Sequence, residues 1–181
     1  MTSGPSVEEL LQRNEQKAQQ HVPIQLLSEM GQLPAEQQQP MPKIFIVSCC
    51  DNRIDPSEIL GLNKWDAVVV RSAAGRVKPQ MQNLLFLDHI LQFTDIMIIH
   101  HTDCTSETFK NAEIRQSLKD RAPDHKDEID QLEFPGFRSL EQSVRDDVQL
   151  VKSSPLVRKA LADRTRGFVY DIKTGRLGPV L

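Results

Sequence analysis

The sequence predicts an α/β fold with a mainly parallel central sheet flanked by helices. Three short apolar runs support this prediction, at residues 44–47, 67–70 and 96–99. They are rich in β-branched residues and do not alternate with polar ones, which is typical of strands buried on both faces of a parallel sheet. Segments with helical spacing lie between the runs, and strands that alternate with helices indicate right-handed crossovers.

Two helices are expected between the three runs. Asp55 is a suitable N-cap and Pro56 a suitable first-turn residue, so a short helix is expected to begin there. A longer helix is expected around residues 81–91, where apolar side chains recur at helical spacing.

The C-terminal half is expected to hold further helices and one more strand. Residues 107–132 are highly charged and interrupted by Pro123, so we expect a helix followed by an exposed excursion. Leucine and valine at spacings of three and four predict an amphipathic helix over residues 140–151. Pro155 is expected to open another helix, and residues 167–172 are predicted to form the last strand.

Residues 1–42 differ in composition from the rest, since nine of the first 40 residues are glutamine. A marginal amphipathic helix is expected after Val7 and a second short one near residues 24–30, with a linker around residues 37–40. We therefore divide the chain into an N-terminal helical arm and linker, 1–42, and an α/β domain, 43–181. The arm is either a frayed tail or a segment that packs on a partner subunit.

Composition excludes several classes of protein. The 181 residues suffice for one domain with a proper core, and the net charge of -3 offers no basic surface for nucleic acid. No apolar stretch approaches the roughly 20 residues that cross a bilayer, and no signal-like segment begins the chain, so we expect an intracellular, cytoplasmic protein. Three cysteines make a poor disulfide framework and fit reduced, metal-binding thiols.

Two cysteines and a histidine with zinc-ligand chemistry follow two separate apolar runs. Cys49 ends the first run, and His101 and Cys104 follow the third, so all three are expected at the carboxyl ends of parallel strands, where ligand sites form. A Cys2His set leaves one position of a zinc tetrahedron open, as in catalytic sites. Cys50 is out of phase with Cys49 and is expected to be a small buried hydrophobe.

A carboxylate and a guanidinium lie close to the first cysteine. If the chain stays extended, Asp51 and Arg53 point to the same side as Cys49. They are either a catalytic dyad beside the metal or a structural ion pair at a strand end.

Four neighbouring residues are expected to have structural roles. Asp103 is expected to cap the following helix, and His100 to be a satisfied histidine at a strand end. Arg71 is expected to lie at the second strand end near the site as a structural bridge, and Gly75 to meet a backbone requirement.

The motif Cys49-x-Asp51-x-Arg53, followed by His101-x-x-Cys104, resembles the signature of the β-class carbonic anhydrases. Four further stretches are similar to this family, the last three of them to its short-chain branch, and the resemblance covers residues 43 to the end. They are residues 70–75, 100–104, 143–148 and 167–175.

The resemblance implies four parallel strands plus an edge strand, assembled as a homodimer or homotetramer in which N-terminal helices embrace the partner. It implies Zn2+ held by Cys49, His101 and Cys104, with Asp51 and Arg53 as the dyad beside it. The implied reaction is the reversible hydration of carbon dioxide to bicarbonate and a proton by zinc-bound hydroxide, with Asp51 orienting the nucleophile.

Three positions depart from the family pattern, and they keep alternatives open. Thr105 replaces the usual glycine after the second cysteine, and Ser72 and Ala74 replace an asparagine and a glycine. A reshaped entrance would suit hydrolysis of carbonyl sulfide or carbon disulfide, and a weakly active, metal-poor relative that acts by association is a third alternative. In some family members the aspartate equivalent to Asp51 closes onto zinc at low pH, so activity is expected to rise with pH.

Overall fold

A computed structural model describes residues 4–24, 26–30, 32, 34, 36, 38 and 40–181. The chain forms two units, residues 1–39 and 40–181, which are described separately. The linker expected around residues 37–40 lies partly outside the described residues.

The N-terminal unit contains the two helices expected there, α1 (Val7–Ala18) and α2 (Leu27–Met30). Helix α1 begins at Ser6, whose side-chain oxygen accepts a hydrogen bond of 3.2 Å from the backbone N–H of Glu9. No residue of α1 is buried, so its apolar side chains face solvent in the isolated chain.

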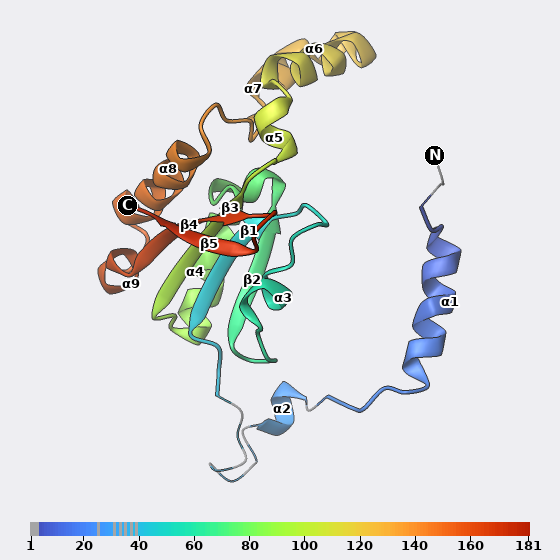
Figure 1. Cartoon of the computed structure of the whole chain (residues 1–181), viewed down its shortest axis with the longest axis vertical. Helices are drawn as coiled ribbons and strands as arrows, with labels where there is room; N and C mark the ends of the chain where they lie inside the picture. The colour runs from blue at the N-terminus through green and yellow to red at the C-terminus, as the bar shows by residue number, and fades with distance from the viewer. Residues whose placement is uncertain are drawn as a thin grey trace. The chain divides into compact units, whose positions relative to one another are not determined.

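The second unit is built on a five-stranded sheet in the order β2-β1-β3-β4-β5 (Figure 1). Neighbouring strands from β2 to β4 are parallel, and β5 pairs antiparallel with β4. This sheet confirms the predicted fold class. The strands are β1 (Ile44–Cys49), β2 (Ala67–Ser72), β3 (Asp95–His101), β4 (Thr165–Asp171) and β5 (Arg176–Val180).

Helices fill the connections between the strands. They are α3 (Pro56–Leu60), α4 (Met81–Leu91), α5 (Thr105–Thr108), α6 (Asn111–Arg121), α7 (Lys126–Gln131), α8 (Leu140–Ser153) and α9 (Lys159–Asp163). Short 3₁₀ helices are η2 (Ala73–Gly75), η3 (Lys78–Gln80) and η4 (Pro123–His125).

Two of the sequence expectations in the C-terminal half were wrong. The strand at residues 167–172 is not the last, because the chain turns back after β4 to form β5. Pro155 does not open a helix, because residues 155–157 form a turn and α9 begins only at Lys159.

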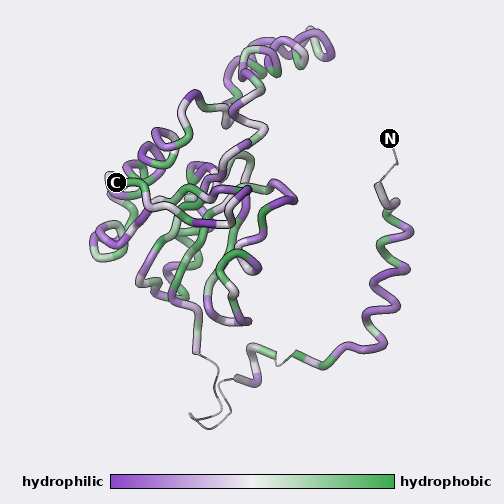
Figure 2. The backbone as a smooth tube through the Cα atoms, viewed as in Figure 1, coloured by the Kyte–Doolittle hydropathy of each residue, from purple (hydrophilic) through white to green (hydrophobic). Residues whose placement is uncertain are grey.

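The main core lies on one face of the sheet. Phe45 and Val47 of β1 are paired in register with Ile96 and Ile98 of β3, and these four fully buried side chains pack with residues of α4, α8 and α9. Figure 2 shows hydrophobic strands at the centre of this unit and a largely hydrophilic α6. Helix α8 lies directly on β4, since a Cβ at Gly167 would meet the side chain of Val144 at 2.3 Å.

The strand order creates a topological switch point. From β1 the chain crosses to β2 on one side, and β3 then lies on the other side of β1. Helices therefore leave the carboxyl ends of β1 and β3 in opposite directions, which opens a crevice where open α/β sheets bind ligands.

Candidate metal centre

Three potential metal ligands meet at this switch point. Cys49 is the last residue of β1, His101 the last residue of β3, and Cys104 the N-cap of α5. Their ligand atoms all lie within 4.8 Å of one another, and all three residues are buried. The structure thus brings together the two cysteines and the histidine that the sequence singled out.

The imidazole of His101 is oriented toward the two sulfurs by its backbone contact. Nδ1 lies 2.9 Å from the carbonyl oxygen of Thr102, so it carries the proton and donates. Nε2 is then the lone-pair nitrogen, and it is a buried polar atom without a hydrogen-bond partner among the described residues. A buried unpartnered nitrogen costs free energy unless something binds it, and a metal ion fits that requirement.

The two thiols form a coupled pair. Their sulfur atoms lie 4.0 Å apart. The hydrogen bond between them, together with burial, raises the pKa of Cys49 to about 12, while the same hydrogen bond lowers the pKa of Cys104 to about 6. The hydrogen bond therefore favours the thiolate form of Cys104, and thiolates are the form that binds metal.

Asp51 and Arg53 pair beside this cluster. The carboxylate of Asp51 accepts from the Arg53 backbone N–H at 2.9 Å, from Nε at 3.0 Å and from Nη2 at 2.7 Å. These charge-assisted hydrogen bonds hold the pKa of Asp51 well below its usual range. Oδ2 of Asp51 lies 3.8 Å from Nε2 of His101, so the carboxylate borders the three potential ligands.

Asp103 does not cap the following helix, contrary to expectation. Its carboxylate accepts a hydrogen bond from Nη1 of Arg53, and its backbone oxygen accepts from Nη2 at 2.8 Å. The N-cap of α5 is Cys104, which makes no side-chain capping bond. Sequence spacing gives no signal for this contact, because Arg53 lies fifty residues earlier in the chain.

Arg71 and Gly75 have the structural roles expected of them. Arg71 donates to the backbone oxygens of Cys49 at 3.0 Å, Asp51 at 2.7 Å and Ile54 at 2.7 Å. These bonds fix the turn that carries the dyad. Gly75 has φ +73 and leaves no room for a side chain.

A cavity of about 740 Å³ opens over the cluster. Asp51, Arg53 and Phe109 are among its lining residues, as are two of the departures from the family pattern, Ala74 and Thr105. Ser72, the third departure, lies outside this lining and donates to the backbone oxygen of Arg76 at 2.7 Å.

Cys50 lies on the wall of the same cavity and is exposed, so the expectation of a buried hydrophobe was wrong. The error comes from the parity argument, because the strand ends at Cys49 and a turn follows.

A model of the family described as carbonic anhydrase matches residues 44–177. The chain belongs to the β-carbonic anhydrase family. Carbonic anhydrases are lyases, and the family recognised from the signature motif is thereby confirmed.

Relatives with curated names support the assignment. The chain is 30% identical over 148 residues to Beta-carbonic anhydrase 1 of Mycobacterium bovis, covering 78% of this chain and 85% of that protein. It is also 25% identical over 156 residues to a carbon disulfide hydrolase of Saccharolobus solfataricus, covering 75% and 76%.

Solved structures of carbonic anhydrases share the fold. The enzyme from Streptococcus mutans superposes with a TM-score of 0.78 at 30% identity, covering 99% of this chain and 100% of that one. The enzyme from Glaciozyma antarctica also gives a TM-score of 0.78, at 28% identity, covering 97% of this chain and 98% of that one.

No helix among the described residues is long and apolar enough to span a membrane.

Proposed function

We propose that this chain binds one zinc ion through Cys49, His101 and Cys104 and catalyses the reversible hydration of carbon dioxide to bicarbonate and a proton. The observation that carries the proposal is the buried convergence of two thiols and an unpartnered imidazole nitrogen at the switch point. Two thiolates and a neutral histidine are a typical donor set for catalytic zinc, which keeps a fourth position for water.

Zinc held there would lower the pKa of a coordinated water from about 16 to about 7 and so supply hydroxide at neutral pH. Asp51 has the charge and the position to accept a hydrogen bond from the attacking oxygen and to aim its lone pair at carbon dioxide. Arg53 keeps Asp51 ionised and in place through its hydrogen bonds.

The pairing of Asp51 with Arg53 supports an open site in this conformation. If Asp51 leaves Arg53 and takes the fourth zinc position at low pH, activity rises with pH. A flat rate profile between roughly pH 6.5 and 9 would exclude such closure, since occupation of the zinc position at low pH would lower the rate there.

The decisive experiment measures zinc content and stopped-flow carbon dioxide hydration on the same samples. Cys104→Ser is expected to lose most of the zinc. Asp51→Ala is expected to keep the zinc and to lose about a hundredfold or more in kcat. Wild-type protein that holds little zinc and does not hydrate carbon dioxide would instead favour a weakly active, metal-poor relative that acts by association.

Carbon disulfide is the second candidate substrate, because curated relatives named carbon disulfide hydrolases match about three quarters of the chain. Ala74 and Thr105 line the cavity over the cluster, where they can change its shape. Parallel assays of bicarbonate and sulfide production decide between the two, and sulfide release that exceeds carbon dioxide hydration would reverse the preference.

Residues 1–42 are proposed to form an arm that packs on a second copy in a homodimer or homotetramer. Val7, Leu10 and Leu11 of α1 are exposed, which leaves an apolar stripe for a partner to cover. Deletion of residues 1–42 is expected to reduce the number of chains per assembly, measured as molar mass by light scattering. A frayed tail would leave that number unchanged.

Three free thiols suit a reducing compartment such as the cytoplasm.

A further inference from the structure

A buried polar cluster lies next to the metal-ligand cluster and takes no part in the chemistry proposed above. We call it the His100 cluster, and it consists of His100, Ser143, Asp147 and Arg76. The first three residues are at most 2% exposed. Nδ1 of His100 lies 2.7 Å from Oγ of Ser143, and Nε2 lies 3.1 Å from Oδ2 of Asp147.

The imidazole ring of His100 is fixed on three sides. The hydroxyl of Ser143 lies 2.7 Å from Nδ1 of His100 and 2.7 Å from the backbone oxygen of Leu140, so it links the ring to the first turn of α8. The carboxylate of Asp147 holds the other ring nitrogen, and the ring of Phe137 stacks on the imidazole with centroids 6.2 Å apart. Both Ser143 and Asp147 come from α8, one turn apart, so this helix sets the orientation of the ring.

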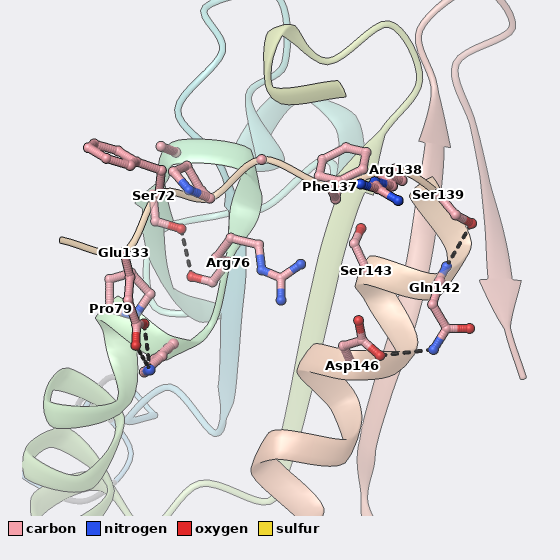
Figure 3. A pocket seen from close by; sticks show the side chains of 15 residues that line it. Ser72, Arg76, Pro79, Glu133, Phe137, Arg138, Ser139, Gln142, Ser143 and Asp146 are labelled. Carbon is pink, nitrogen blue, oxygen red and sulfur yellow. Dashed lines mark hydrogen bonds and ion pairs between the residues drawn. The ribbon is translucent and has the colours of Figure 1, made fainter. Parts of the chain in front are cut away.

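Asp147 also pairs with an arginine side chain. Nη2 of Arg76 lies 3.2 Å from Oδ1 of Asp147. Figure 3 shows Arg76 extending toward α8, where Ser143 is labelled, within a cavity of about 840 Å³. The buried carboxylate therefore ties together three segments, namely the end of β3, the segment after β2, and α8.

The His100 cluster reaches the metal ligands through the backbone. His100 directly precedes His101 in β3. A Cβ at Gly75 would lie 2.9 Å from Cδ2 of His100 and 3.2 Å from the backbone nitrogen of Cys49. Gly75 is thus wedged between the ring of His100 and the last residue of β1, and a rotated ring would press on both strand ends.

We infer that Asp147 is a positioning residue for the metal centre, because through His100 it fixes the ends of β1 and β3 from which Cys49 and His101 project. This inference rests on the proposed zinc site and adds α8 to its support. Groups that orient metal ligands change metal affinity about 10- to 100-fold when removed. Asp147 acts one contact further out, so its loss is expected to cost about tenfold in zinc affinity.

The experiment compares Asp147→Ala and Asp147→Asn with Asp146→Asn as a matched control. Asp146 is the neighbouring carboxylate on α8, is exposed, and accepts a hydrogen bond of 2.8 Å from Gln142. Zinc affinity is measured by competition with a chromophoric chelator, and ligand geometry by the visible spectrum of the cobalt-substituted protein. Neither readout requires turnover.

Asp147→Ala is expected to weaken zinc binding about tenfold and to shift the cobalt bands, while Asp146→Asn matches the wild type. Asp147→Asn keeps an oxygen for His100 but loses the charge that faces Arg76. Its zinc affinity is therefore expected to fall between that of Asp147→Ala and that of the wild type. If Asp147→Ala does not fold, Asp147→Asn decides the question by the same two measurements.

A double-mutant cycle with His100→Phe tests whether Asp147 affects zinc binding through His100. If Asp147 acts through His100, adding Asp147→Ala to His100→Phe causes no further loss of zinc affinity. The inference is overturned if the Asp147 variants bind zinc as tightly as the wild type with an unchanged cobalt spectrum. It is also overturned if the loss persists in full in the His100→Phe background. Wild-type protein that binds no zinc would overturn the proposed function first, before any variant is compared.

Discussion

Arg53 joins the two loops of the candidate metal centre by binding Asp103. Its Nη1 donates to the carboxylate of Asp103 and its Nη2 to the backbone oxygen, while Nε and Nη2 hold Asp51. Asp103 has φ +58, a left-handed conformation that aspartate and asparagine tolerate better than most residues. The geometry of the dyad therefore depends on a residue of the loop after β3.

Substitution of Asp103 tests this dependence. Asp103→Ala is expected to lower kcat about 3- to 10-fold with unchanged zinc content, because Arg53 loses one anchor but keeps its bonds to Asp51. Asp103→Asn keeps an acceptor and the tolerated backbone conformation, so its kcat is expected to lie nearer the wild type. Stopped-flow rates that are equal for alanine and wild type would show that Arg53 needs no second anchor.

Asp88 and Arg158 make the stability of the fold dependent on pH. Arg158 donates to both carboxylate oxygens of Asp88, at 2.8 Å and 2.7 Å, and Phe93 donates its backbone N–H at 2.9 Å. The bonds from Arg158 hold the pKa of Asp88 below its usual range. An aspartate with a depressed folded pKa stabilises the protein above the unfolded pKa of about 4, and this contribution is lost as the pH falls through the folded pKa.

Asp88→Asn is accordingly expected to lower the free energy of unfolding by about 2 kcal/mol at pH 7. The loss is expected to shrink as the pH falls from about 4, where the carboxylate becomes protonated in the unfolded chain, through the lower pKa of the folded protein. Urea denaturation between pH 3 and 7 provides the measurement. Asp163→Asn is the control, since its pair with Lys159 is exposed and is worth at most about 0.5 kcal/mol. A loss that is independent of pH would mean that packing, not charge, explains the effect.

Gly75→Ala is expected to destabilise the fold by about 2 kcal/mol or more, because the new methyl group would meet His100 Cδ2 at 2.9 Å and the backbone oxygen of Ile99 at 3.0 Å. Gly175→Ala separates this crowding from backbone strain. Gly175 has a similar φ of +69, but its nearest neighbour is the Tyr170 hydroxyl at 3.8 Å. Thermal unfolding of the two variants is therefore expected to show the larger loss at Gly75, and equal losses would assign the whole effect to φ.

Removal of zinc is expected to unmask two thiols. Cys50 is exposed, whereas Cys49 and Cys104 are buried and proposed as ligands. A thiol-reactive chromophore is expected to label one cysteine rapidly in the zinc-loaded protein and three after chelation, with a lower melting temperature for the metal-free form. If zinc is added back before labelling, Cys49 and Cys104 are expected to react slowly again. Rapid reaction of all three thiols in the loaded protein would exclude Cys49 and Cys104 as ligands.

The sheet and the site could be predicted where local sequence carries the information. The apolar runs that became β1, β2 and β3 are continuous, and Cys49 and His101 terminate two of them. Strand β5 was not found from its residues, because it contains Gly178 and Pro179, which are rare in strands and tolerated here at the sheet edge.

Contacts made by distant parts of the chain could not be predicted. The partners of His100 lie 43 and 47 residues away, and nothing in their spacing from His100 indicates the contact. One signal was present, since Ser143 and Asp147 are polar residues on the apolar face of α8. Polar residues on such a face are expected to find buried partners, although the sequence does not say which.

Ala73 lines both the cavity above the metal-ligand cluster and the cavity beside Arg76. The two cavities therefore have one lining residue in common, and its side chain is a single methyl group. The NMR signal of an isotope-labelled methyl group at Ala73 would shift when a ligand binds in either cavity. A bulkier residue at this position would shrink both spaces at once.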